Sequence, residues 1–137
     1  MASFEFTASL TEAEDIHLVL LTNNTTHQIH LSTEPKTFTF EIDEDIDQDI
    51  KFIMSNKLPN ANKFDSSGNF IRNPMIKITE IKIENFNIDH WVSTFGVYEL
   101  DEDPNKQEKF YEYMGCNGIV GFTIRGPLWQ WLLENIS

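Results

Sequence analysis

The sequence predicts an all-β fold, an antiparallel β-sandwich or jelly roll with a short C-terminal helix. Apolar and polar residues alternate with period two in most segments, as they do in half-buried strands. Eight or nine such short segments fit into 137 residues, which is typical of sandwiches and jelly rolls. Apolar residues at helical spacing occur near the C-terminus. The length is that of one domain, so we expect residues 1–137 to form a single unit.

The first half of the chain contains five predicted strands. The first begins at Phe4, where apolar residues at even positions alternate with polar ones up to Leu10. Further strands are predicted at residues 18–21, 28–31, 37–42 and 50–55. The segment 18–21 is apolar at every position, so we expect both of its faces to be covered.

The segment 75–83 predicts a strand with an irregularity in its middle. Its isoleucines occupy positions 76 and 78, and then positions 81 and 83. The alternation therefore changes parity at Thr79-Glu80, and a regular strand would send half of these side chains to the wrong face. One extra residue absorbed as a β-bulge keeps all four on the same side, so we expect a bulge there.

The rest of the chain contains further strands, a long loop and a helix. Strands are predicted at 95–98, 109–114 and 119–124, with Trp91 at the end of a strand and the acidic residues 99–103 in a solvated loop. Residues 57–73 are rich in Asn, Ser, Gly and Pro and exceed the roughly 12–15 residues usual for a structureless connection, so we expect a functional or mobile loop. Pro127 suits a first helical turn, and apolar residues at 128, 131 and 132 predict a helix over about 127–135.

Composition argues against several classes of partner. Acidic residues number 22 against 10 basic ones, a net charge of −12, which opposes contact with nucleic-acid phosphates and with anionic membranes. We expect no transmembrane segment and no signal peptide, because no apolar run is long enough and the N-terminus lacks a basic region followed by an apolar one. The sequence does not predict in which cellular compartment the protein is found. The single Cys116 excludes an internal disulfide.

An acidic run is the most unusual local feature. Aspartates occur at every second position, at Asp43, Asp45, Asp47 and Asp49. In an extended chain these four carboxylates point the same way, and such hard oxygen ligands suit Ca²⁺. The run lacks the glycine that an EF-hand loop needs at its sixth position. A metal site and a solvated turn between two strands are the two interpretations.

Aromatic residues are the second candidate binding feature. Flat rings provide rigid surface that stacks on sugars, and we predict this role for Trp91. Trp129 and Trp131 are two positions apart, so on a helix they diverge by roughly 200° and cannot both face the same core. One of them is therefore exposed or buried against a partner subunit. The alternative for this helix is simple capping of an open end of the sandwich.

The segments 37–42, 50–57 and 73–83 together resemble a calcium-dependent carbohydrate-binding module of jelly-roll type. The resemblance covers residues 37–89. It implies binding of a polysaccharide without catalysis, through Ca²⁺ held by loop carboxylates and carbonyls. Where the family carries aspartate, this chain has Asn56-Lys57 and Asn73-Pro74, which leaves Asp65 and the acidic run as replacement carboxylates. The residues assigned to ligand binding are thus Trp91, Asn56, Asp65 and Asn73.

These patterns predict a binding module rather than an enzyme, and we assign no catalytic residue. The expected ligand is a glycan, with Ca²⁺ as a cofactor near residues 57–73 and the acidic run. The alternative is a structural or assembly subunit, for example of a virion or an appendage. In that case Trp129 and Trp131 contact another protein subunit, and the partner can be a second copy of the chain.

Overall fold

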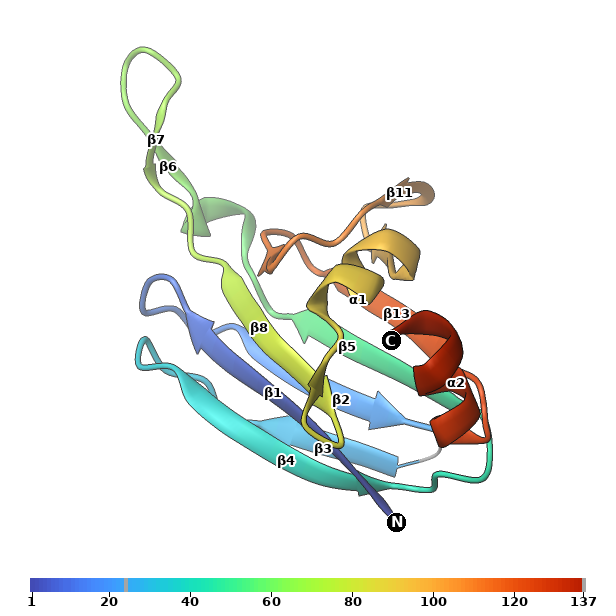
Figure 1. The fold of residues 1–137 in the computed structure, drawn as a ribbon. Coiled ribbons are helices and arrows are strands. Elements are labelled where there is room, and N and C mark those ends of the chain that lie inside the picture. The colour runs from blue at the N-terminus through green and yellow to red at the C-terminus, as the bar shows by residue number, and fades with distance from the viewer. Residues whose placement is uncertain (24, 137) are drawn as a thin grey trace.

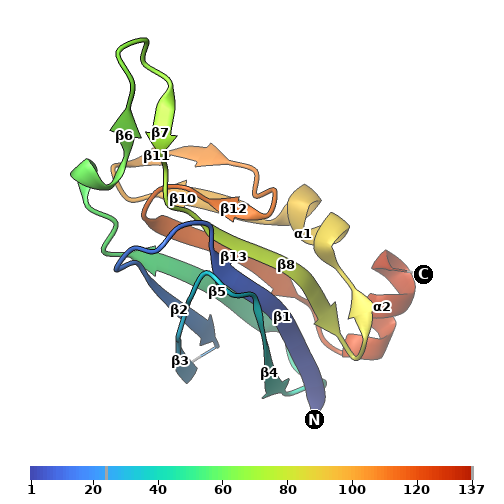
Figure 2. The same ribbon diagram turned by 90° about the vertical axis from the view of Figure 1, so that its left-hand side faces the viewer.

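The computed structural model describes residues 1–23 and 25–136, which form two facing antiparallel sheets (Figures 1 and 2). In the first sheet the strands run in the order β12-β8-β1-β4, and β9 pairs with β8. The bounds of its strands are β1 Ala2–Leu10, β4 Lys36–Ile42, β8 Ile76–Ile83, β9 Phe86–Asn87 and β12 Tyr113–Met114.

The second sheet has the order β11-β10-β13-β5-β2-β3. The bounds of its strands are β2 His17–Thr22, β3 Thr25–Ile29, β5 Gln48–Ser55, β10 Val97–Leu100, β11 Asp103–Glu108 and β13 Gly118–Ile124. Every neighbouring pair in both sheets is antiparallel. The predicted antiparallel sandwich is therefore confirmed, as are four of the five predicted strands of the first half. The strand predicted at 28–31 lies earlier, at Thr25–Ile29.

Phenylalanine rings join the two sheets at the centre of the core. Phe4 and Phe6 point inward from β1, Phe52 from β5 and Phe122 from β13, and each is at most 6% exposed. The ring of Phe52 meets that of Phe6 edge-on at a centroid distance of 5.0 Å, and lies 6.2 Å from Phe122. Burial of such large apolar rings supplies most of the driving force that holds two sheets together.

The predicted bulge in β8 is confirmed. Ile76, Ile78, Ile81 and Ile83 are all buried, at 1% exposure or less. Glu80 has a positive φ of 51°, and the pairing of β8 with β1 shifts register at the same place. The extra residue returns the second pair of isoleucines to the inner face, as the parity change predicts.

The C-terminal helix is also confirmed, as α2 over Leu128–Asn135. Pro127 stands just before it in an extended conformation, and Leu128, Trp131 and Leu132 are buried on its inner face. The Leu128 amide donates to the Glu44 carbonyl at 2.8 Å, which ties the start of the helix to the turn between β4 and β5.

A second helix contradicts the prediction for the region of Trp91. Residues Asp89–Phe95 form α1, so Trp91 lies in a helix and not at the end of a strand, and the predicted strand at 95–98 begins only at Val97. The Asp89 carboxylate accepts hydrogen bonds from the amides of Glu80 and Ile81, at 3.1 and 2.8 Å. This anchor and the packing of buried Val92 override the weak helix propensity of a short segment with β-branched and aromatic residues.

Two further predictions for the second half are wrong. Of residues 109–114 only Tyr113–Met114 form a strand, and strand β11 begins at Asp103, in the stretch expected to be a solvated loop. In the described sheet β11 pairs with β10 alone. Charged side chains on a solvent-exposed edge strand stay hydrated, and they keep the edge from pairing with another chain. The sequence of such a strand therefore need not show the alternation of a half-buried strand.

The segment 57–73 forms a projection that contains short regular elements. It contains a single 3₁₀ turn, η1 (Pro59–Ala61), and a hairpin of β6 (Lys63–Phe64) and β7 (Phe70–Arg72), which stands out from the sandwich in both views (Figures 1 and 2). At its base Arg72 forms ion pairs with Glu12 and Glu14, at 3.2 and 2.5 Å. The hairpin is therefore fastened to the loop between β1 and β2.

Burial of Tyr98 makes stability depend on pH in the alkaline range. Its hydroxyl donates to the Cys116 carbonyl and accepts from the Cys116 amide, and burial raises the pKa of Tyr98 well above its ordinary value of 10.0. Above pH 10 the unfolded chain loses this proton while the folded protein keeps it, so the free energy of unfolding falls as pH rises. We expect urea titrations between pH 9 and 11 to show this fall. Tyr98→Phe, although less stable at pH 8, should show a shallower one, and an unchanged slope would contradict this assignment.

Candidate functional site

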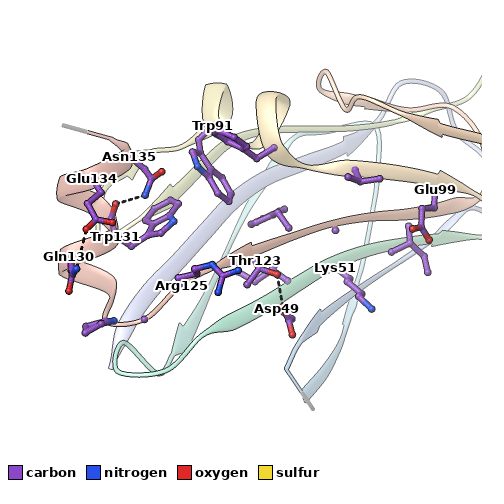
Figure 3. Close-up of a pocket in the computed structure, with 18 residues that line it drawn as sticks. Asp49, Lys51, Trp91, Glu99, Thr123, Arg125, Gln130, Trp131, Glu134 and Asn135 are labelled. Carbon is purple, nitrogen blue, oxygen red and sulfur yellow. Dashed lines mark hydrogen bonds between the residues drawn. The ribbon is translucent and has the colours of Figure 1, made fainter.

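A groove of about 870 Å³ runs along the outer face of the second sheet (Figure 3). Its floor consists of outward-facing residues of β5, β10 and β13, and α1 and α2 supply its wall. The volume lies in the range of roughly 300–1,000 Å³ found for small-molecule sites.

The wall of the groove is aromatic. Trp91 is partly exposed and lies 5.4 Å from Phe95, which is 60% exposed. Trp131, only 5% exposed, meets Trp91 edge-on at 4.8 Å (Figure 3). Trp131 therefore supports the Trp91 ring from the core, and Trp91 and Phe95 offer the accessible ring surface.

Polar side chains surround this aromatic wall. The Thr123 hydroxyl donates to the Asp49 carboxylate at 2.6 Å, and Gln130 donates to Glu134 at 3.1 Å. Arg125 and Lys51 form no ion pair with any residue in the described part of the chain. The groove thus contains two carboxylates, Asp49 and Glu134, that accept hydrogen bonds from neutral side chains. It also contains two cationic side chains, Arg125 and Lys51, that are not in ion pairs.

The groove brings together three of the residues singled out from the sequence. Trp91 and Asp49 line it, and so does Trp131, which was predicted as a partner contact. Trp129, the other predicted partner contact, is 51% exposed and does not line the groove. The predicted divergence of the two tryptophans on the helix is confirmed.

The other predicted ligand residues lie away from the groove and hold loops in place. The Asn56 side-chain amide donates to the Asp15 carbonyl at 2.6 Å, and Asn73 accepts from the Lys57 ammonium at 2.9 Å. Burial lowers the pKa of Lys57, although nearby Cys116 and acidic groups oppose the shift.

Asp65 organises the tip of the β6–β7 hairpin. Its carboxylate accepts from the amides of Asn69 and Ser67, both at 2.9 Å, and these hydrogen bonds hold its pKa below the ordinary value. This role is structural. Ligand binding by Asn56, Asp65 and Asn73 stays a prediction.

The acidic run does not have the extended geometry expected of it. Residues 43–47 form a turn between β4 and β5, so the four carboxylates do not project in one direction. The Asp43 carboxylate accepts from the Asp45 amide at 2.9 Å, and that of Asp47 accepts from the Gly126 amide at 2.8 Å. Within residues 1–23 and 25–136, no group of three or more His, Cys, Asp or Glu side chains is placed to hold a metal ion.

Several lining residues were missed by the sequence analysis. Phe95, Arg125, Gln130 and Asn135 belong to the groove, but the sequence analysis assigned none of them a role in binding. One signal was present in β13, where Gly121 and Thr123 occupy outward positions between apolar inner ones. Small or polar residues on the outer face of a central strand leave room for a ligand.

No helix in the described ranges is both long and apolar enough to cross a membrane.

Comparisons with known proteins find proteins of similar structure but none that matches in sequence. No family model matches the chain, and no curated protein matches it. The structure is similar to that of vCBM60 in its selenomethionine form. That structure is described as showing a circular permutation that provides an evolutionary link between two families of calcium-dependent carbohydrate-binding modules. That match has a TM-score of 0.58 and 14% identity, and covers 89% of this chain and 90% of the other.

A second structure, vCBM60 in complex with galactobiose, matches with a TM-score of 0.55 and 16% identity, over 88% of this chain and 96% of the other. Identities this low establish the fold alone. The match nevertheless extends the resemblance from residues 37–89 to most of the chain. The chain therefore has the fold of a calcium-dependent carbohydrate-binding module.

Proposed function

We propose that this chain is a non-enzymatic carbohydrate-binding module whose glycan lies in the groove on the second sheet. The observation that carries the proposal is the accessible aromatic wall of Trp91 and Phe95 inside a groove of about 870 Å³. The partly exposed Trp91 ring, held from behind by Trp131, and the exposed Phe95 ring beside it give a stacking surface that needs little ordering when a sugar binds.

The polar lining suits the hydroxyl groups of a sugar. Asp49, Gln130 and Asn135 supply planar carboxylate and amide groups, and Arg125 supplies a fork of donors. Asp49 comes from β5, Arg125 directly follows β13, and Gln130 and Asn135 come from α2, so the polar lining of the groove is supplied by three parts of the chain (Figure 3). The galactobiose bound to vCBM60 supports carbohydrate as the ligand class.

Replacement of Trp91 by alanine tests the proposal. We expect titration calorimetry with the best ligand from a glycan array to show a dissociation constant weakened about tenfold or more, because a central aromatic contact is worth at least about 1.4 kcal/mol. Trp129→Ala is the matched control, since it removes an exposed tryptophan of α2 outside the groove. Equal losses in both variants, or no retention of any glycan, would contradict the proposal.

Calcium binding at Asp43, Asp45, Asp47 and Asp49 stays a prediction, and the same titrations test it. The fold of calcium-dependent modules supports it, whereas the hydrogen bonds that already occupy Asp43 and Asp47 oppose it. If the glycan affinity is the same in EDTA and in Ca²⁺, binding in the groove does not require the metal. A Ca²⁺-specific rise in the melting temperature, lost in an Asp45→Asn, Asp47→Asn variant, would establish the metal site.

An assembly role is the second candidate, and the exposure of Trp129 favours it. A large ring that is half exposed on a terminal helix is suited to contact a partner subunit. Trp131 is buried within its own chain, so any such contact would rest on Trp129. Loss of association in Trp129→Ala with unchanged glycan affinity would favour this role.

A further inference from the structure

Strand β4 presents a free edge. It pairs with β1 over seven residues without a register shift, and no strand of the described chain pairs with its other side (Figure 2). The backbone groups on that side form a regular row, which is a template for another strand.

The other edges of the two sheets are shorter or irregular. Strands β9 and β12 have two residues each, β3 has five, and the pairing of β11 with β10 shifts register. β11 also carries several charged side chains. Such features discourage pairing with another chain, whereas β4 has neither a bulge nor a proline.

In β4 two phenylalanines are placed symmetrically about Thr39. Phe38 and Phe40 flank this residue, and Thr37 and Glu41 stand one position further out. If two β4 strands run antiparallel with Thr39 opposite Thr39, Phe38 of each faces Phe40 of the other. Aromatic pairs and threonine pairs directly across two strands are favourable.

Side-chain exposure and charge agree with that arrangement. Phe38 and Phe40 pack on Phe6 at 5.6 and 6.1 Å, and Phe40 also packs on His27 at 4.5 Å, yet both phenylalanines are only half-buried. On the outer face Glu41 would meet Thr37 of the other copy, so no like charges would stand directly opposite each other.

We infer that this protein associates with a second copy of itself through β4, which joins the two five-stranded sheets across a two-fold axis at Thr39. Two-fold contacts are self-complementary, and in this register each Phe38 meets the Phe40 of the other copy while each Glu41 meets a Thr37. The contact area is small and each copy carries a charge of −12, so the dimer is weak, grows with protein concentration and is strengthened by salt.

Two lysine substitutions on the same face of β4 test this dimer. In the monomer residue 39 lies opposite Glu5, so Thr39→Lys should fold normally, but the dimer would bring two lysines together. Thr37→Lys would instead face Glu41 of the second copy. By sedimentation velocity at rising concentration, the wild type and Thr37→Lys should approach twice 15.9 kDa, and Thr39→Lys should stay at 15.9 kDa. A dimer that Thr39→Lys leaves intact would overturn the inference.

Cross-linking locates the axis independently. In a Cys116→Ser background, Thr39→Cys places two thiols directly opposite each other, at the Cα separation of roughly 4.5–5.5 Å that a disulfide accepts. Oxidation should give a covalent dimer for Thr39→Cys and none for Thr37→Cys. A chain that remains monomeric at all concentrations and does not cross-link at position 39 would refute the inference.

Discussion

Replacement of Phe52 by alanine should lower the free energy of unfolding by about 3–5 kcal/mol, the range for loss of a buried aromatic ring. Phe52 is 0% exposed and its ring contacts those of Phe4, Phe6 and Phe122, so it joins β5 to strands of both sheets. The neighbouring rings cannot collapse into the space, because each is held by its own strand. Urea denaturation monitored by circular dichroism measures the loss.

Phe86→Ala is the matched control for this prediction. Phe86 is 49% exposed on the short strand β9, so its truncation should change the free energy of unfolding by about 0.5 kcal/mol or less. If both variants lost the same stability, the aromatic cluster around Phe52 would not be the centre of the core.

Replacement of Gly118 by alanine should destabilise the protein by about 3 kcal/mol or more, since overpacking against backbone exceeds the usual cost of an extra methyl group. A Cβ atom on Gly118 would lie 2.2 Å from the Glu99 carbonyl oxygen and 3.0 Å from the Tyr98 ring. The backbone of β10 cannot yield without breaking its pairing with β13. Thermal unfolding should show a lower midpoint.

Gly121→Ala on the same strand separates this steric effect from the general effect of changing a glycine. Its Cβ would meet the Lys51 side chain at 3.6 Å, which is an ordinary contact. Alanine there should leave the midpoint nearly unchanged or raise it slightly. A Gly118→Ala variant as stable as Gly121→Ala would show that β10 and β13 are not as closely packed as described.

The fold was predictable from the sequence wherever a single periodic pattern was strong. The isoleucines of β8 specified both the strand and its bulge, because one face of that strand must be buried. The spacing of Leu128, Trp131 and Leu132 specified α2 in the same way. In both cases the local pattern and the tertiary packing agree.

The groove was beyond the reach of sequence reasoning. Trp91 and Asp49 could be named as candidates, but they are joined only because α1 follows β9 and brings Trp91 over β13. The helix itself depends on the hydrogen bonds from the amides of Glu80 and Ile81, at the bulge of β8, to Asp89. A contact between two separate elements cannot be predicted from the pattern of residues within either one. The acidic run misled for the opposite reason, because its alternation suggested an extended chain where the crossing from one sheet to the other requires a turn.

The connection between α2 and the turn at residues 43–47 has a consequence for local unfolding. The Glu44 carbonyl accepts from Leu128, and the Asp47 carboxylate accepts from Gly126, which itself packs against the backbone of Ile46. The helix cannot lift from the sheet without releasing the turn, so the two should open as one cooperative unit and exchange their amide protons at matching rates. The lifetime of this part of the groove wall then depends on residues 43–47, which do not line the groove.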